Sequence, residues 1–431
     1  MGRIESARAR ALSRPSAPSF GVPPLGGLFG VKLLKDLQLR KARLKAELHT
    51  KPPDACPLHP LPTPSRRARL CFRSASRRLG KEGKDVMKKV RFGVIGAGGI
   101  ADRRALPGLL ETASCELAAV MDVANAEDLG RKYGVAWYDG EEALLAHPNI
   151  DAVYIATPVH LHLNQIKQAA LAGKNVLVEK PICMTSSQAE EAVSACEKAG
   201  VVLQEGYMMR FHGAHRRIKE IISSGVIGKP VYARAQLACW YPPIQGAWRQ
   251  HLNFGGGGAL IDMGTHLFDL LEMLLGPIAK VAAVIRTQVH DYEVEDSAIT
   301  LLEFENGCQA TVDTSFCVPD AASRTRLEIY ASRGAVLSEG TIGQGKDGKL
   351  EVYAEAGGKG YEAGQLKDFQ SSFREEPFEH VNPYTCEFES FARAVLAGKQ
   401  AELDARRGVH ILRIVEMAYE SSKTGITQNL R

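Results

Sequence analysis

The 431-residue chain is long enough for two domains with separate cores, and its 45% hydrophobic and 24% charged residues are typical of a soluble globular protein. Residues 1–86 carry 19 Lys and Arg against 6 Asp and Glu, which leaves 35 against 43 for the rest. The remainder is therefore acidic, which argues against a nucleic-acid partner, and no run of 18 apolar residues predicts a membrane span.

Residues 1–87 form a basic leader that holds ten of the 21 prolines. Val31–Leu48 is long enough for one amphipathic helix, but the rest has little to bury, and its composition predicts disorder. A transit peptide and an over-extended start both fit, and Met87, placed directly before a strand, favours the second. A twin-arginine export signal is excluded, because Cys71–Lys81 places arginines where apolar residues must follow.

The first strand of the predicted cofactor domain, residues 88–208, is Val90–Ile95, and it ends in the sequence GAGGIA. In this GxGxx[G/A] turn, the first glycine permits a tight bend, the second lets the backbone approach a pyrophosphate, and the alanine allows close helix packing. The N–H groups of the following helix are free to bind phosphate. We therefore expect cofactor contacts from Gly96, Gly98, Gly99, Ile100 and Ala101.

Asp122 follows the second predicted strand, Glu116–Met121. A carboxylate at this strand end is placed to accept hydrogen bonds from the adenosine ribose, and it repels a 2′-phosphate. Val123 offers no guanidinium that would bind such a phosphate. The pattern favours NAD over NADP, with an ordinary helix N-cap as the alternative role of Asp122.

Three more strands, Ala152–Ala156, Asn175–Val178 and Val201–Gln204, alternate with helical runs at 163–172 and 187–199. This alternation predicts an α/β fold with a doubly wound parallel sheet, whose ligands bind at the carboxyl ends of the strands. The residues at those ends, which share one edge with the glycine turn, are Thr157, Pro158, His162, Glu179 and Lys180.

Four motifs in order, GAGGIA, ATPVHLH, VEKPI and GGGGALIDMGTHLFD, give a family resemblance over residues 88–431. The chain resembles the Gfo/Idh/MocA oxidoreductases, named for glucose–fructose oxidoreductase and inositol dehydrogenase. The resemblance implies a Rossmann domain followed by a substrate domain, residues 209–431, on a large, mostly antiparallel open sheet. That sheet often mediates dimers or tetramers in the family, so we expect a homodimer or homotetramer.

Hydride transfer to or from a carbon that bears oxygen requires a proton donor or acceptor. Lys180 stands before a proline at a strand end, where its side chain projects into the cofactor crevice, and the resemblance gives the lysine of EKP the catalytic role. Asp262 and His266 are spaced i, i+4 on the predicted helix Ala259–Leu275 and share a face. The resemblance implies that both line the substrate site and share the proton transfer.

Other residues complete the expected site. The run Gly255–Gly258 is expected to leave room for substrate, and Asp269, one turn beyond His266, to be a structural hydrogen-bond partner. Arg210 and Arg249 are candidates to bind substrate hydroxyls or a carboxylate, and Trp240 to stack on a sugar ring, with packing roles as the alternative. A metal site is not expected, because the Asp/His pair has no third ligand and the nine scattered cysteines show no zinc spacing.

The motifs predict an NAD(P)-dependent oxidoreductase, the resemblance implies a sugar, cyclitol or related polyol as its substrate, and the scattered cysteines fit a reducing, cytoplasmic compartment. An organelle location follows only if the leader is a genuine transit peptide. Two alternatives remain open: NAD-assisted elimination or glycoside cleavage without net redox, and a regulator that binds dinucleotide and sugar without turnover.

Overall fold

The computed structural model describes residues 88–355 and 373–430. The predictions for the leader lie outside the described residues. Within them the chain forms two sheets, one of six strands and one of nine.

The six-stranded sheet is parallel with strand order β3-β2-β1-β4-β5-β6, the doubly wound order of a dinucleotide-binding fold. Its central strands are largely apolar and buried, because helices cover both faces of such a sheet. The strands are β1 (Val90–Ile95), β2 (Cys115–Met121), β3 (Ala136–Tyr138), β4 (Ala152–Ile155), β5 (Asn175–Glu179) and β6 (Leu203–Gly206). The helices between them are η2 (Ala101–Ala105), α3 (Leu106–Leu110), α4 (Ala126–Tyr133), α5 (Glu141–Leu145), η3 (Val159–Leu161), α6 (His162–Leu171) and α7 (Ser186–Ala199).

The nine-stranded sheet has the order β14-β13-β12-β11-β7-β10-β9-β8-β15, and only its β7–β10 pair is parallel. Its strands are β7 (Pro230–Ala238), β8 (Ile278–Arg286), β9 (Ser297–Phe304), β10 (Gln309–Ser315), β11 (Arg326–Ala331), β12 (Gly334–Glu339), β13 (Lys349–Ala354), β14 (Arg374–Glu375) and β15 (Gln428–Asn429). The expected fold class, a Rossmann domain plus a mostly antiparallel open sheet, is confirmed.

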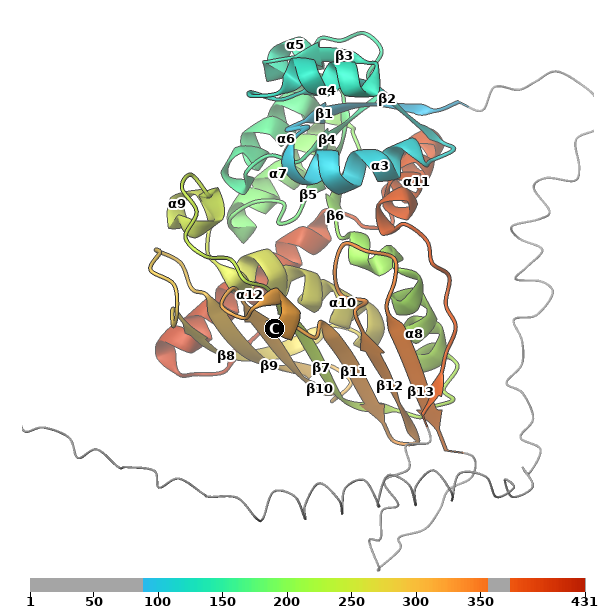
Figure 1. Cartoon of the computed structure of the whole chain (residues 1–431), viewed down its shortest axis with the longest axis vertical. Helices are drawn as coiled ribbons and strands as arrows, with labels where there is room; N and C mark the ends of the chain where they lie inside the picture. Colours follow the sequence, from blue (N-terminus) through green and yellow to red (C-terminus); the bar gives the residue numbers. More distant parts are fainter. Residues whose placement is uncertain (1–87, 356–372, 431) are drawn as a thin grey trace, which may run out of the picture. The chain divides into compact units, whose positions relative to one another are not determined.

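Helices cover one face of this second sheet, as Figure 1 shows for α8 (Gly213–Ser223), α10 (Thr265–Leu275) and α12 (Arg406–Thr424). Burial alternates along β9 accordingly: Leu302 and Phe304 are buried beneath the helices, whereas Ile299 and Leu301 are exposed on the other face. Short helical turns complete the chain: η4 (Met208–Phe211), η5 (Trp248–Gln250), α9 (Leu252–Gly255), η6 (Leu260–Gly264) and η7 (Asp320–Ala322).

The helix α11 (Pro383–Ala397) packs on the parallel sheet, beside α3 in Figure 1. The Phe388 and Phe391 rings lie 5.2 and 5.7 Å from the Phe92 ring of β1, measured between centroids. A segment from near the end of the chain therefore completes the core of the nucleotide-binding sheet.

Two predicted elements differ from the structure. The strand expected at Val201–Gln204 begins two residues later, and the Asn175 side chain accepts the Val202 N–H at 3.0 Å just before it. The helix expected at Ala259–Leu275 opens with the π-helical turn η6 before α10 continues in α geometry.

Candidate active site

The glycine turn after β1 is held against the end of β2. Gly96 has a φ of +78°, which a side chain would strain, and its N–H donates to Met121 O at 2.9 Å. The Gly98 N–H donates to Asp122 Oδ2 at 3.0 Å, and a Cβ on Gly98 would lie 3.0 Å from that oxygen. Beyond the turn, η2 begins without a side-chain cap, and the N–H groups of Ala101 and Asp102 donate to Gly98 O at 3.1 and 3.4 Å. These features fit a dinucleotide pyrophosphate.

Asp122 is fixed by backbone donors rather than by another side chain. Its Oδ1 accepts the N–H groups of Ala124 and Asn125 at 3.0 and 3.1 Å. The N-cap of α4 is Asn125, so Asp122 closes the turn before the helix and does not cap it. The carboxylate therefore stands at the strand end where a ribose would lie.

The loops after β4 and β5 are joined by His162. This residue is buried, and its ring nitrogens lie 3.0 Å from Thr157 O and 3.0 Å from Pro181 O. Burial lowers the pKa of His162 to about 4, so the ring is neutral. Because a neutral imidazole has a single N–H, it donates to only one of these two carbonyl oxygens. The ring is enclosed within the chain, so the expected cofactor contact of His162 is not supported. Thr157, whose Oγ1 donates to Gln165 Oε1 at 2.5 Å, and Pro158 remain half-buried at the strand end.

Glu179 directly precedes Lys180 in the chain, and its carboxyl group is hydrogen-bonded on both oxygens. Its Oε1 accepts from the Tyr154 hydroxyl at 2.5 Å, and its Oε2 accepts from the Lys180 N–H at 3.2 Å. Burial raises the pKa of Glu179. Both carboxyl oxygens are therefore already bound within the chain, and Glu179 supports the loop instead of standing open to a cofactor.

Lys180 connects the two halves of the described chain. Its Nζ donates to Asp262 O at 2.6 Å and to Asp262 Oδ1 at 3.0 Å, and both side chains are mostly buried. Arg249 Nε donates to the same Oδ1 at 3.1 Å, and the Arg249 guanidinium stacks on the Trp248 ring at 4.2 Å. An ammonium has three donors, so one remains for a substrate oxygen.

The charges of this cluster set two pKa values. Burial raises the pKa of Asp262, but the nearby charges of Lys180 and Arg249 outweigh it and hold the pKa far below its ordinary value. Burial, reinforced by the Lys180 charge, lowers the pKa of His266 well below its ordinary value. Within the described residues, the buried His266 Nδ1 finds no hydrogen-bond partner. The site thus combines an ionised aspartate with a neutral histidine, both close to Lys180.

The π-helical turn η6 carries Asp262. A π-turn bonds residue i to i+5 and commonly marks a functional site. Here the main-chain carbonyl of Asp262 accepts Lys180 Nζ. The α-helical i, i+4 spacing that we expected between Asp262 and His266 is therefore wrong in its geometry, although both residues do lie by Lys180.

The glycine run before this turn is filled by the protein. A Cβ on Gly256 would lie 3.0 Å from Met184 Cβ, and Gly258 packs on the Glu295 backbone. The Glu295 carboxylate accepts the N–H groups of Gly258 and Leu260, both at 2.9 Å. The expectation that this run leaves room for substrate is wrong, because the glycines admit the Met184 and Glu295 loops and the Tyr419 side chain of α12 instead.

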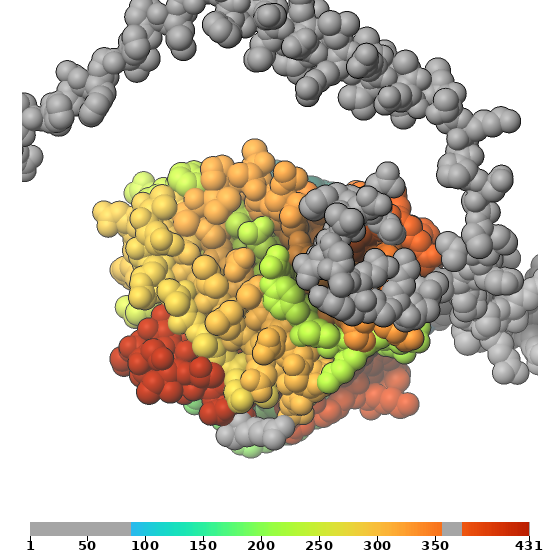
Figure 2. All heavy atoms as spheres, turned by 90° about the horizontal axis from the view of Figure 1, so that it is seen from below, coloured from blue at the N-terminus to red at the C-terminus, as the bar shows by residue number. Residues whose placement is uncertain are grey.

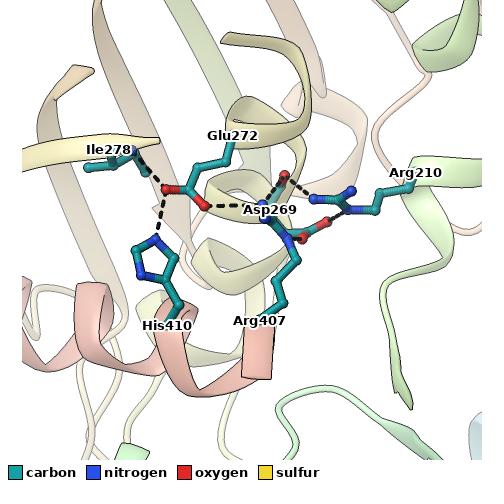
Figure 3. A network of polar contacts seen from close by, with 6 residues as sticks. All are labelled: Arg210, Asp269, Glu272, Ile278, Arg407 and His410. Carbon is teal, nitrogen blue, oxygen red and sulfur yellow. Dashed lines mark hydrogen bonds and ion pairs between the residues drawn. The ribbon is translucent and has the colours of Figure 1, made fainter. Parts of the chain in front are cut away.

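Arg210 binds the buried Asp269 of α10 and does not bind the Lys180–Asp262 cluster. Its Nε donates to Asp269 Oδ2 at 2.6 Å, and Arg407 donates to Asp269 Oδ1 from the other side, as Figure 3 shows. Arg407 Nη2 also reaches Glu272 Oε2 at 3.1 Å, and His410 Nε2 lies 2.9 Å from Glu272 Oε1. The structural role expected for Asp269 is confirmed, and the substrate contact expected for Arg210 is not supported.

Sequence reasoning missed several residues around this site. Tyr241 is half-buried beside Arg249 and Asp262, and burial raises the pKa of its hydroxyl, which stays protonated. The His160 ring lies 4.8 Å from the Phe254 ring. The expected position Trp240 is 44% exposed and contacts the His290 ring at 4.8 Å, so its sugar-stacking role stays a prediction. The sequence signal was a position inside the ATPVHLH motif for His160 and adjacency to Trp240 for Tyr241, and neither fixes the direction of a side chain.

Three further observations concern the described part of the chain. The residues described offer no group of three or more His, Cys, Asp or Glu that could hold a metal ion. The seven cysteines there are free thiols. Of the helices described, none has the length and apolar character needed to cross a membrane.

Comparison with known proteins identifies the class. Residues 90–207 match the oxidoreductase family with an NAD-binding Rossmann fold, and residues 215–337 match the GFO/IDH/MocA C-terminal domain. The fold and the matched sequence together define an NAD(P)-dependent oxidoreductase. The chain belongs to the Gfo/Idh/MocA family, which confirms the resemblance seen in its motifs.

Its relatives cover most of the described chain. The chain is 29% identical over 344 residues to D-xylose 1-dehydrogenase (NADP(+)) 2 of Haloferax volcanii, covering 79% of this chain and 99% of that protein. It is 32% identical over 261 residues to 1,5-anhydro-D-fructose reductase of Ensifer adhaerens, covering 59% and 77%. It is 30% identical over 319 residues to scyllo-inositol 2-dehydrogenase (NAD(+)) of Bacillus subtilis, covering 72% and 87%.

Solved structures share the fold. A 3-ketoreductase from Actinomadura kijaniata, in complex with NADP and TDP-benzene, superposes with a TM-score of 0.67 at 26% identity, covering 78% of this chain and 98% of that one. A levoglucosan dehydrogenase in complex with NADH and levoglucosan superposes with a TM-score of 0.70 at 20% identity, covering 80% and 100%, which shows the fold alone.

Proposed function

We propose that the chain is a dehydrogenase or reductase that transfers a hydride between NAD(H) and the hydroxyl-bearing or carbonyl carbon of a sugar, cyclitol or related polyol. The observation that carries this proposal is the Lys180–Asp262–Arg249 cluster at the carboxyl edge of the parallel sheet, where such folds bind their ligands. The relatives named above act on neutral polyhydroxylated compounds, which supports the substrate class.

The reaction needs a hydride and a proton to leave an alcohol, or both to reach a carbonyl. The nicotinamide, when bound, exchanges the hydride. The Lys180 ammonium donates two of its N–H groups to Asp262, so its third N–H is left to bind the substrate oxygen. In reduction the ammonium donates a proton to that oxygen, and in oxidation the neutral amine takes one from it.

The neighbours of Lys180 tune this exchange. The ionised Asp262 orients the lysine, and Arg249 binds the same carboxylate oxygen, so the cluster keeps a net positive charge. His266 stays neutral because of its burial, so it serves as a hydrogen-bond partner of the substrate hydroxyl and not as a charged acid. These roles also suit NAD-assisted elimination, which lacks net redox, and the first experiment separates the two.

Replacing Lys180 tests the proposal. With D-xylose, scyllo-inositol and 1,5-anhydro-D-fructose as the first probes, absorbance at 340 nm follows NADH formation or loss. We expect turnover with one compound class and a fall in kcat of about 10²–10⁴ in Lys180→Met, because general acid–base catalysis contributes that much.

The matched control is Lys167→Met, which removes an exposed lysine of α6 that pairs with Glu191. Its kcat should stay within about twofold of the unsubstituted enzyme. Full activity in Lys180→Met would contradict the proposal. A stable 340 nm absorbance accompanied by a new product in mass spectrometry would replace it with the elimination reaction.

We further propose that the cofactor is NAD and not NADP. The relatives do not decide this point, since their names include both cofactors. The support is the Asp122 carboxylate, which is held by three backbone N–H groups, and the 86% exposed Val123 beside it, which has no charge to bind a phosphate.

Asp122→Ala should therefore lower the preference for NAD over NADP by about tenfold or more in kcat/KM, because it removes a charge that repels the 2′-phosphate. The exposed acid Glu127 of α4 provides the control Glu127→Ala, which should leave the ratio unchanged. A higher kcat/KM for NADP in the unsubstituted enzyme would show that the cofactor assignment is wrong.

We also propose that two copies associate through the open face of the nine-stranded sheet, which Figure 2 shows from below. Val284, Ile299 and Leu301 are each more than half exposed on that face, and adjacent apolar side chains of this kind are a common mark of an interface.

Light scattering should give at least a dimer mass, and Ile299→Lys with Leu301→Lys should give a monomer. The control Val123→Lys, outside this sheet, should keep the dimer. A monomeric unsubstituted chain would contradict this proposal.

A further inference from the structure

The first turn of α12 contacts both elements that bear the proposed catalytic groups. Arg407 and Gly408 stand in this turn, well over a hundred residues after Asp262 and Lys180. On one side the turn meets the loop that follows Lys180, and on the other it meets α10, the helix that continues from Asp262 and His266.

Gly408 packs on Glu205 of β6, which binds the loop that follows Lys180. Glu205 is buried, and its Oε1 accepts the Ile182 N–H at 2.9 Å, two residues after Lys180. A Cβ on Gly408 would overlap the Glu205 Oε2 atom and would lie 2.8 Å from Ile182 Cγ2. A side chain at position 408 would therefore have to displace the carboxyl group that accepts the Ile182 N–H, which the glycine avoids.

Arg407 reaches the catalytic helix through Asp269. Its Nε donates to Asp269 Oδ1, and its Nη2 lies 3.2 Å from Asp269 O and 3.1 Å from Glu272 Oε2. The Asp269 side chain is 2% exposed and stands one turn after His266. Figure 3 shows this guanidinium beside the α10 carboxylates.

A third contact strengthens the connection of α12 to the lysine loop. The Glu416 carboxylate accepts the Ser186 N–H and the Ser186 Oγ–H, both at 2.7 Å, where α7 begins. The loop after Lys180 and the helix α10 are therefore both bound to α12. Among the hydrogen bonds described, none joins α12 directly to Lys180, Asp262 or His266.

We propose that Arg407 and Gly408 are positioning residues for hydride transfer: they set the placement of Lys180 relative to Asp262 and His266. This inference rests on the proposed function, because it takes those three residues as the groups that handle the proton. A misplacement of about 1 Å at such groups is enough to reduce the rate by about a hundredfold.

Gly408→Ala gives a test with a diagnostic sign. Alanine favours a helix over glycine, so a glycine that served only the helix would be improved by the change. The clash with Glu205 predicts the opposite. In the full-length enzyme with the substrate that the 340 nm assay identifies, we expect kcat to fall at least about tenfold with KM changed less than about threefold, because the defect lies at the reacting groups.

The matched control for this variant is Gly140→Ala, where a Cβ meets nothing within 4 Å. For the second arm, Arg407→Lys removes the guanidinium that binds Asp269 and Glu272, and we expect the same loss of kcat. Its control is Arg413→Lys on the same helix, whose exposed partner is Glu190 of α7. Both controls should keep the kcat of the unsubstituted enzyme.

Hydrogen–deuterium exchange on the NADH-bound protein gives a readout that needs no substrate. Peptides that cover residues 180–186 and 262–269 should exchange about tenfold faster in Gly408→Ala and Arg407→Lys than in the unsubstituted enzyme. Their exchange rates should be unchanged in the two controls. If Gly408→Ala does not fold, Arg407→Lys carries the test alone. Unchanged kcat and unchanged exchange in folded variants would overturn the inference. Full activity in Lys180→Met would instead overturn the proposed function, and exchange would still test the placement.

Discussion

The candidate active site depends most on one ion pair, in which the mostly buried Lys180 ammonium binds both the carboxylate and the main-chain carbonyl of Asp262. The pair joins a strand end of the parallel sheet to the helix that leads into the second sheet. Removing one partner of a buried pair is costly, because the other charge is left without compensation. Arg249 binds the same carboxylate, so the cluster keeps a net positive charge that suits an oxygen on which negative charge develops.

The surrounding structure serves to hold this pair. Glu179 accepts the Lys180 N–H and Glu205 accepts the Ile182 N–H, so both carboxyl groups hold the backbone around the catalytic lysine. Glu295 receives the N–H groups that open the π-turn of Asp262, and Asp269 fastens the following helix to Arg210 and Arg407. These four carboxyl groups are thus hydrogen-bonded within the chain and support the segments that carry Lys180 and Asp262.

Local signals predicted much of this arrangement. The glycine turn and Lys180 were found because strand, turn and helix are consecutive in sequence, and the parallel sheet brings strand ends to one edge. What failed was decided by distant contacts. The π-turn at Asp262 meets a lysine 82 residues earlier in the chain. Arg210 was drawn into the fold by Asp269, 59 residues away, and Phe388 packs on Phe92 across most of the described chain. Periodicity carries no information on such partners.

A double-substitution cycle on the pair itself tests the account most directly. The rate of hydride transfer in a single turnover would be measured for Lys180→Met, Asp262→Asn and the double variant. If the two residues act as one unit, the double variant should be slower than Lys180→Met by less than about threefold, because the effects of residues that act together do not add. Losses that multiply in the double variant would show two independent roles and would contradict the central place given to this ion pair.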